Sequence, residues 1–96
     1  MSYKFKNPEE ILIIWSGYKP LMARQSFYYK SLSEQFEDEI KDSLLEFAKG
    51  ASVDTDNPFY EQISLMFRFF EWDNVNLTYS FEFDGFKFSG DIEGLK

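Results

Sequence analysis

Residues 75–92, with the sequence VNLTYSFEFDGFKFSGDI, decide the fold, because apolar and polar side chains alternate along them on both sides of Asp84-Gly85. Alternation with a period of two is typical of a β-strand that buries one face and exposes the other. An Asp-Gly pair between two such runs is typical of a two-residue hairpin turn, in which both central residues need a positive φ. The pattern predicts an antiparallel hairpin that places Phe83 opposite Phe86.

A second strong pattern covers residues 31–49. The segment Ser31-Leu32-Ser33-Glu34 has the form of a capping box, and Gly50 is placed to end a helix. Between them, apolar side chains recur every three or four residues: Leu32, Phe36, Ile40, Leu44 and Phe47. This spacing predicts one amphipathic helix over residues 31–49, about 27 Å long at 1.5 Å per residue.

The other elements are predicted by weaker patterns. Asn7-Pro8-Glu9-Glu10 is typical of a helix start and Gly17 of a helix end, so we expect a short helix of about ten residues between them. Residues 21–30 mix strand-forming and helix-forming side chains, and we expect extended structure there. For residues 58–72 we expect a short helical turn at 58–62 followed by a buried strand, although periodicity alone leaves helix and strand open.

The length and composition indicate one globular domain, residues 1–96, with 44% apolar and 21% aromatic residues. We expect an α+β fold in which an antiparallel β-meander of three or four strands packs against one long and one short α-helix. No apolar run approaches the roughly 20 residues of a membrane span or forms a signal-peptide core. A cytoplasmic protein that does not contact a membrane is therefore expected.

The chain has no cysteine and no histidine. This excludes disulfides, metal sites built on thiolate or imidazole, and Ser-His or Cys-His catalytic pairs. The five glycines are scattered, so no glycine-rich phosphate loop exists. Carboxylates spread over a solvated helix face have no reason for the raised pKa that acid-base catalysis needs. We expect no catalytic residue, no cofactor and no metal, and a binding protein rather than an enzyme.

The charge of the chain is strongly asymmetric. The sequence holds 17 acidic and 10 basic residues, for a net charge of −7. Residues 1–30 carry five bases and two acids, whereas residues 31–96 carry five bases and fifteen acids. Such a field repels nucleic acids and anionic membranes and speeds the encounter with a basic protein. The expected partner is a basic protein and not a nucleic acid.

The acids concentrate on the polar face of the predicted helix over residues 31–49. Four of them recur every fourth residue and form one ridge if the helix is continuous: Glu34, Asp38, Asp42 and Glu46. Glu37 and Glu39 flank this ridge. Like charges four residues apart destabilise a helix by about 0.2–0.5 kcal/mol per pair, and a face that is only solvated normally interleaves lysines. The ridge is therefore a candidate partner-binding surface, with an ordinary solvated face as the open alternative.

Two apolar residues are candidate anchors for the same partner. At 100° per residue, Leu45 points away from the apolar stripe and into the acidic side of the helix. Trp72 lies at the turn before the last hairpin, where an exposed aromatic ring can fill a pocket on a partner. An apolar anchor with a polar rim is the usual layout of a protein interface, although a buried Trp72 and an ordinary exposed Leu45 are the plainer alternatives.

The acidic Glu34–Glu46 helix, the aromatic strand-rich tail through Tyr79–Phe86, the small size and the absence of cysteine and histidine together resemble a class of small acidic bacterial proteins. These are the immunity proteins, or antitoxins, that bacteria make against their own secreted toxins, including those of contact-dependent growth inhibition and polymorphic nuclease systems. The resemblance implies a tight 1:1 complex that occludes the cationic active site of a toxin, often a nuclease. It transfers no binding residue to this sequence. A phage-type nucleic-acid mimic and a self-associating domain that forms a homodimer remain alternatives.

Overall fold

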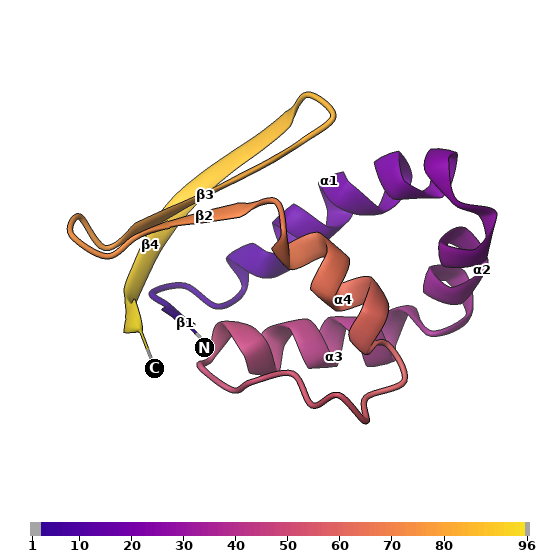
Figure 1. Ribbon diagram of the computed structural model, residues 1–96, viewed down its shortest axis with the longest axis horizontal. Coiled ribbons are helices and arrows are strands. Elements are labelled where there is room, and N and C mark those ends of the chain that lie inside the picture. The colour runs from indigo at the N-terminus through magenta and orange to yellow at the C-terminus, as the bar shows by residue number, and fades with distance from the viewer. Residues whose placement is uncertain (1–2, 96) are drawn as a thin grey trace.

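The computed structural model describes residues 3–95 and shows an α+β fold (Figure 1). Within this range the elements follow in the order β1 (Tyr3–Phe5), α1 (Glu10–Gln25), α2 (Phe27–Gln35), α3 (Glu37–Ala48), α4 (Tyr60–Phe67), β2 (Phe70–Asp73), β3 (Thr78–Phe83) and β4 (Phe86–Leu95). The predicted fold class is confirmed. The described residues form four helices rather than one long and one short helix.

The four strands form one antiparallel sheet in the order β1-β4-β3-β2. Strands β2, β3 and β4 are the predicted meander, but the fourth strand does not extend it from the β2 side. Instead β1, from the start of the chain, pairs with the far end of β4, where Lys4 lies opposite Gly94. Lys4 also forms an isolated bridge to Lys49, directly after α3, so β1 joins the sheet to the helical part of the molecule.

The hairpin predicted at Asp84-Gly85 is confirmed. Both residues have a positive φ, 51° and 88°, as a two-residue hairpin turn requires. The register places Phe83 opposite Phe86 and Phe81 opposite Phe88. The period-two pattern and the turn therefore predict the register of β3 and β4 correctly from local sequence alone.

Strand β3 begins three residues later than the alternation suggests. Asp73 Oδ1 accepts hydrogen bonds from the backbone N–H groups of Val75 and Asn76, at 3.0 and 2.9 Å, and holds the chain in a turn. Leu77 adopts a φ of 56° in this turn. Val75 and Leu77, which the pattern places on the buried face, are consequently 90% and 44% exposed.

The single helix predicted over residues 31–49 is wrong, because the helix is broken at Phe36. Phe36 has φ −126° and ψ 35°, and its ring packs on Phe59 with the centroids 5.4 Å apart. The preceding helix, α2, starts before the expected capping box: the Ser26 hydroxyl accepts the Tyr29 N–H and caps it. The extended structure expected at residues 21–30 is also wrong, because residues 21–25 continue α1 and residues 27–30 form the first turn of α2 after this cap.

Helix α1 does not end at Gly17 but continues through Pro20 to Gln25. Gly17 is explained by packing instead. A Cβ atom at Gly17 would lie 2.3 Å from Cζ of Phe86, so the ring of this β4 residue rests directly on the helix backbone. A glycine in mid-helix here permits the close approach of sheet and helix. At residues 58–72, the expected helical turn is a full helix, α4, and the strand starts only at Phe70.

The contact between Gly17 and Phe86 should decide whether Gly17→Ala lowers or raises the free energy of unfolding. Gly17→Ala should lower the free energy of unfolding by about 1 kcal/mol, because the added methyl group overpacks the contact. In a Phe86→Ala background the same substitution should raise it by about 1 kcal/mol, because alanine is the better helix former. Chemical denaturation of the four proteins of this cycle measures both values. Stabilisation in both backgrounds would contradict the packing role of Gly17.

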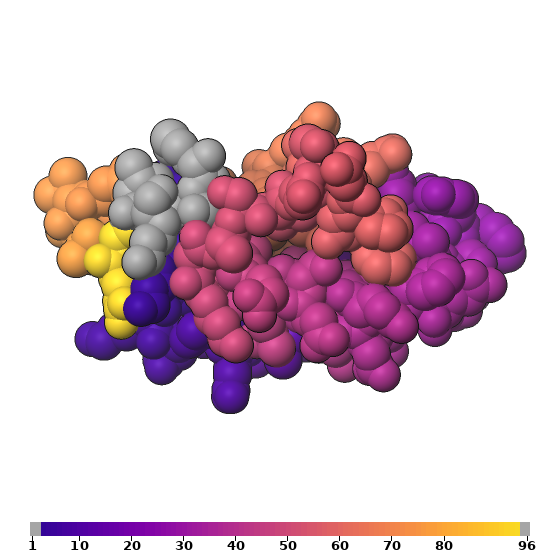
Figure 2. All heavy atoms as spheres, turned by 90° about the horizontal axis from the view of Figure 1, so that it is seen from below, coloured from indigo at the N-terminus to yellow at the C-terminus, as the bar shows by residue number. Residues whose placement is uncertain are grey.

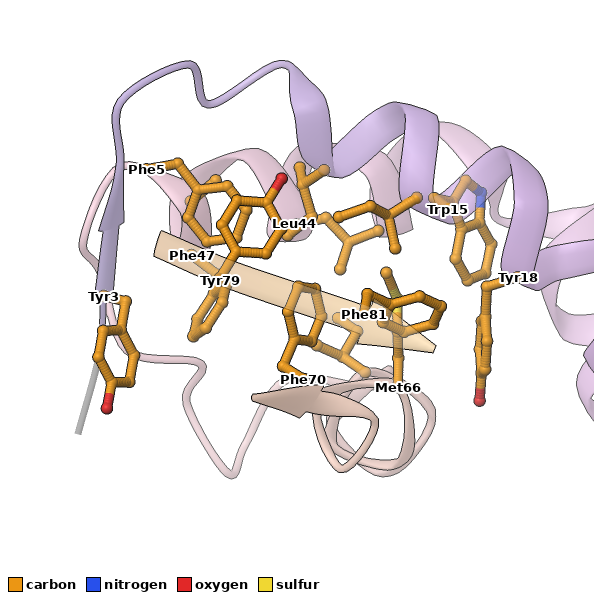
Figure 3. Close-up of a cluster of buried hydrophobic side chains, with 14 of the residues drawn as sticks. Tyr3, Phe5, Trp15, Tyr18, Leu44, Phe47, Met66, Phe70, Tyr79 and Phe81 are labelled. Carbon is orange, nitrogen blue, oxygen red and sulfur yellow. The ribbon is translucent and has the colours of Figure 1, made fainter. Parts of the chain in front are cut away.

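The buried side chains form one apolar cluster between the helices and the inner face of the sheet (Figure 3). Aromatic rings dominate it, and they include Phe5, Trp15, Tyr18, Phe47, Phe70, Tyr79 and Phe81. Phe5 from β1 is fully buried, with its centroid 4.6 Å from that of Tyr79 and 6.2 Å from that of Phe47. The cluster fixes the position of α3 against β1, and it thereby decides which face of α3 remains outside.

Candidate protein-binding surface

Helix α3 presents an acidic face to solvent on the side opposite its buried residues. Asp38, Glu39, Asp42 and Glu46 are all exposed, and they follow one another around the outer half of the helix. Within residues 3–95 none of these four makes an ion pair with a lysine or arginine. Figure 2 shows the molecule from below, with α3 (magenta) between the connector that follows it (pink) and the start of α1 (indigo). We call these four side chains the α3 acidic face.

The predicted ridge of four carboxylates is corrected by the helix break at Phe36. Glu34 belongs to α2 and not to α3, so it is not on one helical ridge with Asp38, Asp42 and Glu46. Its carboxylate lies 3.8 Å from the Lys30 ammonium in an i,i+4 ion pair. Three members of the ridge remain on α3, and Glu39, predicted only as a flanking contact, completes the exposed face.

Glu37, the other acid in the first turns of α3, serves a structural contact. Its carboxylate lies 3.1 Å from the Lys19 ammonium of α1 and 3.4 Å from the Lys41 ammonium. The hydrogen bond and charge of Lys19, followed by those of Lys41, lower the pKa of Glu37. Glu37 therefore links α1 to α3. Because two bases balance its charge, we do not count it as part of the α3 acidic face.

Leu45 lies in a groove between α1 and α3, at the edge of the α3 acidic face. The groove has a volume of about 790 Å³. Its lining is Asn7, Pro8, Glu9, Glu10, Leu12, Ile13, Leu45 and Lys49. Leu12 and Leu45 are half-buried against the core, and Ile13 is 51% exposed on the rim. The groove adjoins the α3 acidic face, because Leu45 lies one turn after Asp42 on the helix surface. Leu45 thus forms the apolar part of the groove together with Leu12 and Ile13.

Trp72 is not brought together with the α3 acidic face. Its ring is stacked between Tyr3 and Phe70, with centroid distances of 3.9 and 5.0 Å and interplanar angles of 7° and 6°. It also lies 6.4 Å from the ring of Phe47, on the buried side of α3. The ring packs the edge of the sheet, and the structure favours the plainer alternative for this residue.

The groove includes residues that sequence reasoning did not select. Ile11-Leu12-Ile13-Ile14 is more apolar than one buried stripe of a helix requires, and this excess was the available signal for an exposed Ile13. The pairing of α1 with α3 that turns this excess into a groove depends on the tertiary fold. Pro8 and Glu9 belong to the groove because they precede α1.

Comparison with protein families, with curated proteins and with solved structures found no match to this chain. Across residues 3–95, none of the helices is long and apolar enough to cross a membrane. The same residues contain no cluster of three or more acidic side chains arranged to hold a metal ion.

A substitution at Asp42 tests whether repulsion within the α3 acidic face destabilises the fold. It has a like charge one turn before it, Asp38, and another one turn after it, Glu46. Asp42→Ala should raise the free energy of unfolding by about 0.5–1 kcal/mol, because two repulsive pairs disappear and alanine is the better helix former. Urea denaturation at low salt and at 1 M salt measures the effect and its charge-dependent part. A loss of stability at low salt would contradict the repulsion.

Proposed function

We propose that this protein is an inhibitor of the immunity type, which binds a basic protein, such as a toxin domain, through the α3 acidic face and the adjoining groove. The observation that carries the proposal is the presence of four exposed carboxylates without a basic partner in the described chain, next to an apolar groove. Two other surface acids of the helices are balanced by bases, Glu34 by Lys30 and Glu37 by Lys19 and Lys41. The concentration of unbalanced charge on one side is what a basic partner would recognise.

The two parts of the surface have different roles in binding. Exposed carboxylates accelerate the encounter with a cationic protein and orient it, so they act on affinity mainly through the association rate. Slow dissociation must come from apolar contacts that exclude water, and Leu12, Ile13 and Leu45 provide them beside the acids. A basic protein with an apolar projection therefore fits this surface better than a nucleic acid, which the carboxylates repel.

The spacing of the acids supports a nuclease as the class of target. Asp38, Asp42 and Glu46 follow one another at about 6 Å along the helix axis, since four residues of helix rise 6 Å. A row of negative groups can occupy a cationic cleft in place of the phosphates of a substrate. Binding there inhibits a nuclease without any chemistry on the part of the inhibitor.

The proposal is tested by capture followed by an inhibition assay. The immobilised full chain is exposed to the native lysate, and the retained proteins are identified, purified and titrated with the free chain. We expect a basic protein whose activity is lost at a 1:1 ratio and whose binding weakens as salt is raised. Retention of an acidic protein, or binding that is independent of salt, would overturn the proposal.

A further inference from the structure

Two exposed aromatic side chains lie at the start of α2, at the end of the molecule remote from the sheet (Figure 1). Phe27 is 81% exposed and Tyr28 is 67% exposed, the highest values of any aromatic side chains among the described residues. The largest exposed apolar patch on a protein is often functional, and these two adjacent rings make the start of α2 a candidate contact surface. We call Phe27 and Tyr28, with Lys30, Ser31 and Glu34 on the same side of the helix, the α2 face.

The exposure of this face is fixed by contacts on the opposite side of α2. The Tyr29 hydroxyl donates a 2.6 Å hydrogen bond to Glu61 of α4. Leu32 packs against the core, and Ser33 is buried. The helix cannot rotate to bury Phe27 without breaking the Tyr29–Glu61 hydrogen bond and exposing Leu32 and Ser33. The two rings therefore stay exposed unless another molecule contacts them.

The charges of the α2 face indicate which molecule binds there. Lys30 and Glu34 lie on it 3.8 Å apart and balance one another, although the whole chain carries a net charge of −7. A basic partner is thus directed to the α3 acidic face and not to this one. A second copy of the chain is repelled by most of the surface, but it meets no net charge here. Under a two-fold rotation, a face with one lysine and one glutamate is complementary to itself.

We propose that two copies of this chain associate through α2, with the two helices antiparallel about a two-fold axis near Ser31. Phe27 lies about 10 Å from Glu34 along the axis of α2, so each Phe27 ring reaches the last turn of the other copy's helix. Each Lys30 then faces the Glu34 carboxylate of the second copy. The α3 acidic face remains free in such a dimer, which can bind two partner molecules.

Sedimentation equilibrium of the full chain over about 1 μM to 1 mM tests the dimer. The wild type should show a monomer–dimer equilibrium, and Phe27→Ser/Tyr28→Ser should raise its dissociation constant at least tenfold. Both side chains are exposed, so the variant should keep the circular dichroism spectrum of the wild type. Val75→Ser, at a 90% exposed residue outside α2, is the matched control and should leave the dissociation constant unchanged. A wild type that is monomeric throughout, or equal effects at both sites, would overturn the dimer.

A charge exchange tests the antiparallel arrangement. Lys30→Glu and Glu34→Lys should each weaken self-association, because each makes the two facing α2 surfaces alike in charge. An equimolar mixture of the two variants should associate more strongly than either alone, because opposite charges then meet across the interface. A mixture no stronger than its components would overturn the arrangement.

The proposed dimer and the proposed inhibitory function can be tested independently of each other. Phe27→Ser/Tyr28→Ser should still inhibit the captured basic protein at a 1:1 ratio, because the α3 acidic face is intact. Loss of that inhibition would assign the α2 face to the partner and would overturn the dimer. Raised salt should leave self-association unchanged or strengthen it, since it screens the repulsion between two chains of charge −7.

Discussion

Phe5→Ala is expected to lower the free energy of unfolding by about 3–5 kcal/mol, a large part of the total for a domain of this size. Phe5 is fully buried and extends from a strand of only three residues into the centre of the core. Its ring contacts the rings of Phe47, Phe70, Trp72 and Tyr79. The substitution should therefore leave a cavity that α3 and the sheet both line, and detach β1 from β4.

Denaturation by urea, followed by circular dichroism, measures this loss. Phe27→Ala is the matched control, because it removes the same ring from a site that is 81% exposed, and it should change the stability of the monomer by less than about 0.5 kcal/mol. The comparison is made at low micromolar concentration, so that self-association does not contribute. Similar losses for the two variants would contradict the central position of Phe5.

The place of β1 could not be predicted from the sequence. A strand of three residues is too short to show a period, and Tyr3 and Phe5 pair with residues near the other end of the chain, Leu95 and Ile92. By contrast, the β3–β4 hairpin depends on a local turn and on alternation within one stretch, and its register was predicted correctly. Local patterns thus predicted the β3–β4 hairpin, whereas the start of β2 and the pairing of β1 with β4 depend on the assembled core.

The helices show the same division between local and tertiary causes. Gly17 is a helix-ending residue by propensity, yet α1 passes through it, and the glycine serves there to let the Phe86 ring pack on the helix backbone. Phe36 fits the apolar period of its neighbours, yet its backbone departs from the helix and its ring meets Phe59. In each case a residue distant in the sequence decides the outcome. Propensity and periodicity describe only what a segment prefers by itself.

The candidate site was predictable to the extent that it depends on one helix. The outward direction of Asp38, Asp42 and Glu46 follows from the helical period, and the structure retains it. The inclusion of Glu34 assumed a continuous helix and was lost at the break. The groove around Leu45 needs two helices that are separate in the sequence, so only its apolar residues, and not their meeting, could be foreseen.

Neutralising the α3 acidic face should have the largest effect on binding. The variant Asp38→Asn/Glu39→Gln/Asp42→Asn/Glu46→Gln changes the net charge from −7 to −3. Its association rate constant with the captured basic protein should fall at least tenfold at low salt, because electrostatic steering contributes factors of about 10–10³ to such rates. The dissociation rate should change less, because the apolar groove is intact. Stopped-flow mixing over a salt series measures both, and the wild type and variant should converge at high salt.

The outer face of the sheet supplies the matched control for this experiment. Glu71→Gln/Glu82→Gln/Asp91→Asn/Glu93→Gln reaches the same net charge of −3 through exposed residues that lie on β2, β3 and β4. If steering depends on the position of the acids, this variant should keep most of the wild-type association rate. Equal losses in the two variants would show that net charge alone governs the encounter, and the α3 acidic face would then have no special role. A loss confined to the α3 variant, in a protein that remains folded, identifies that face as the surface the partner approaches first.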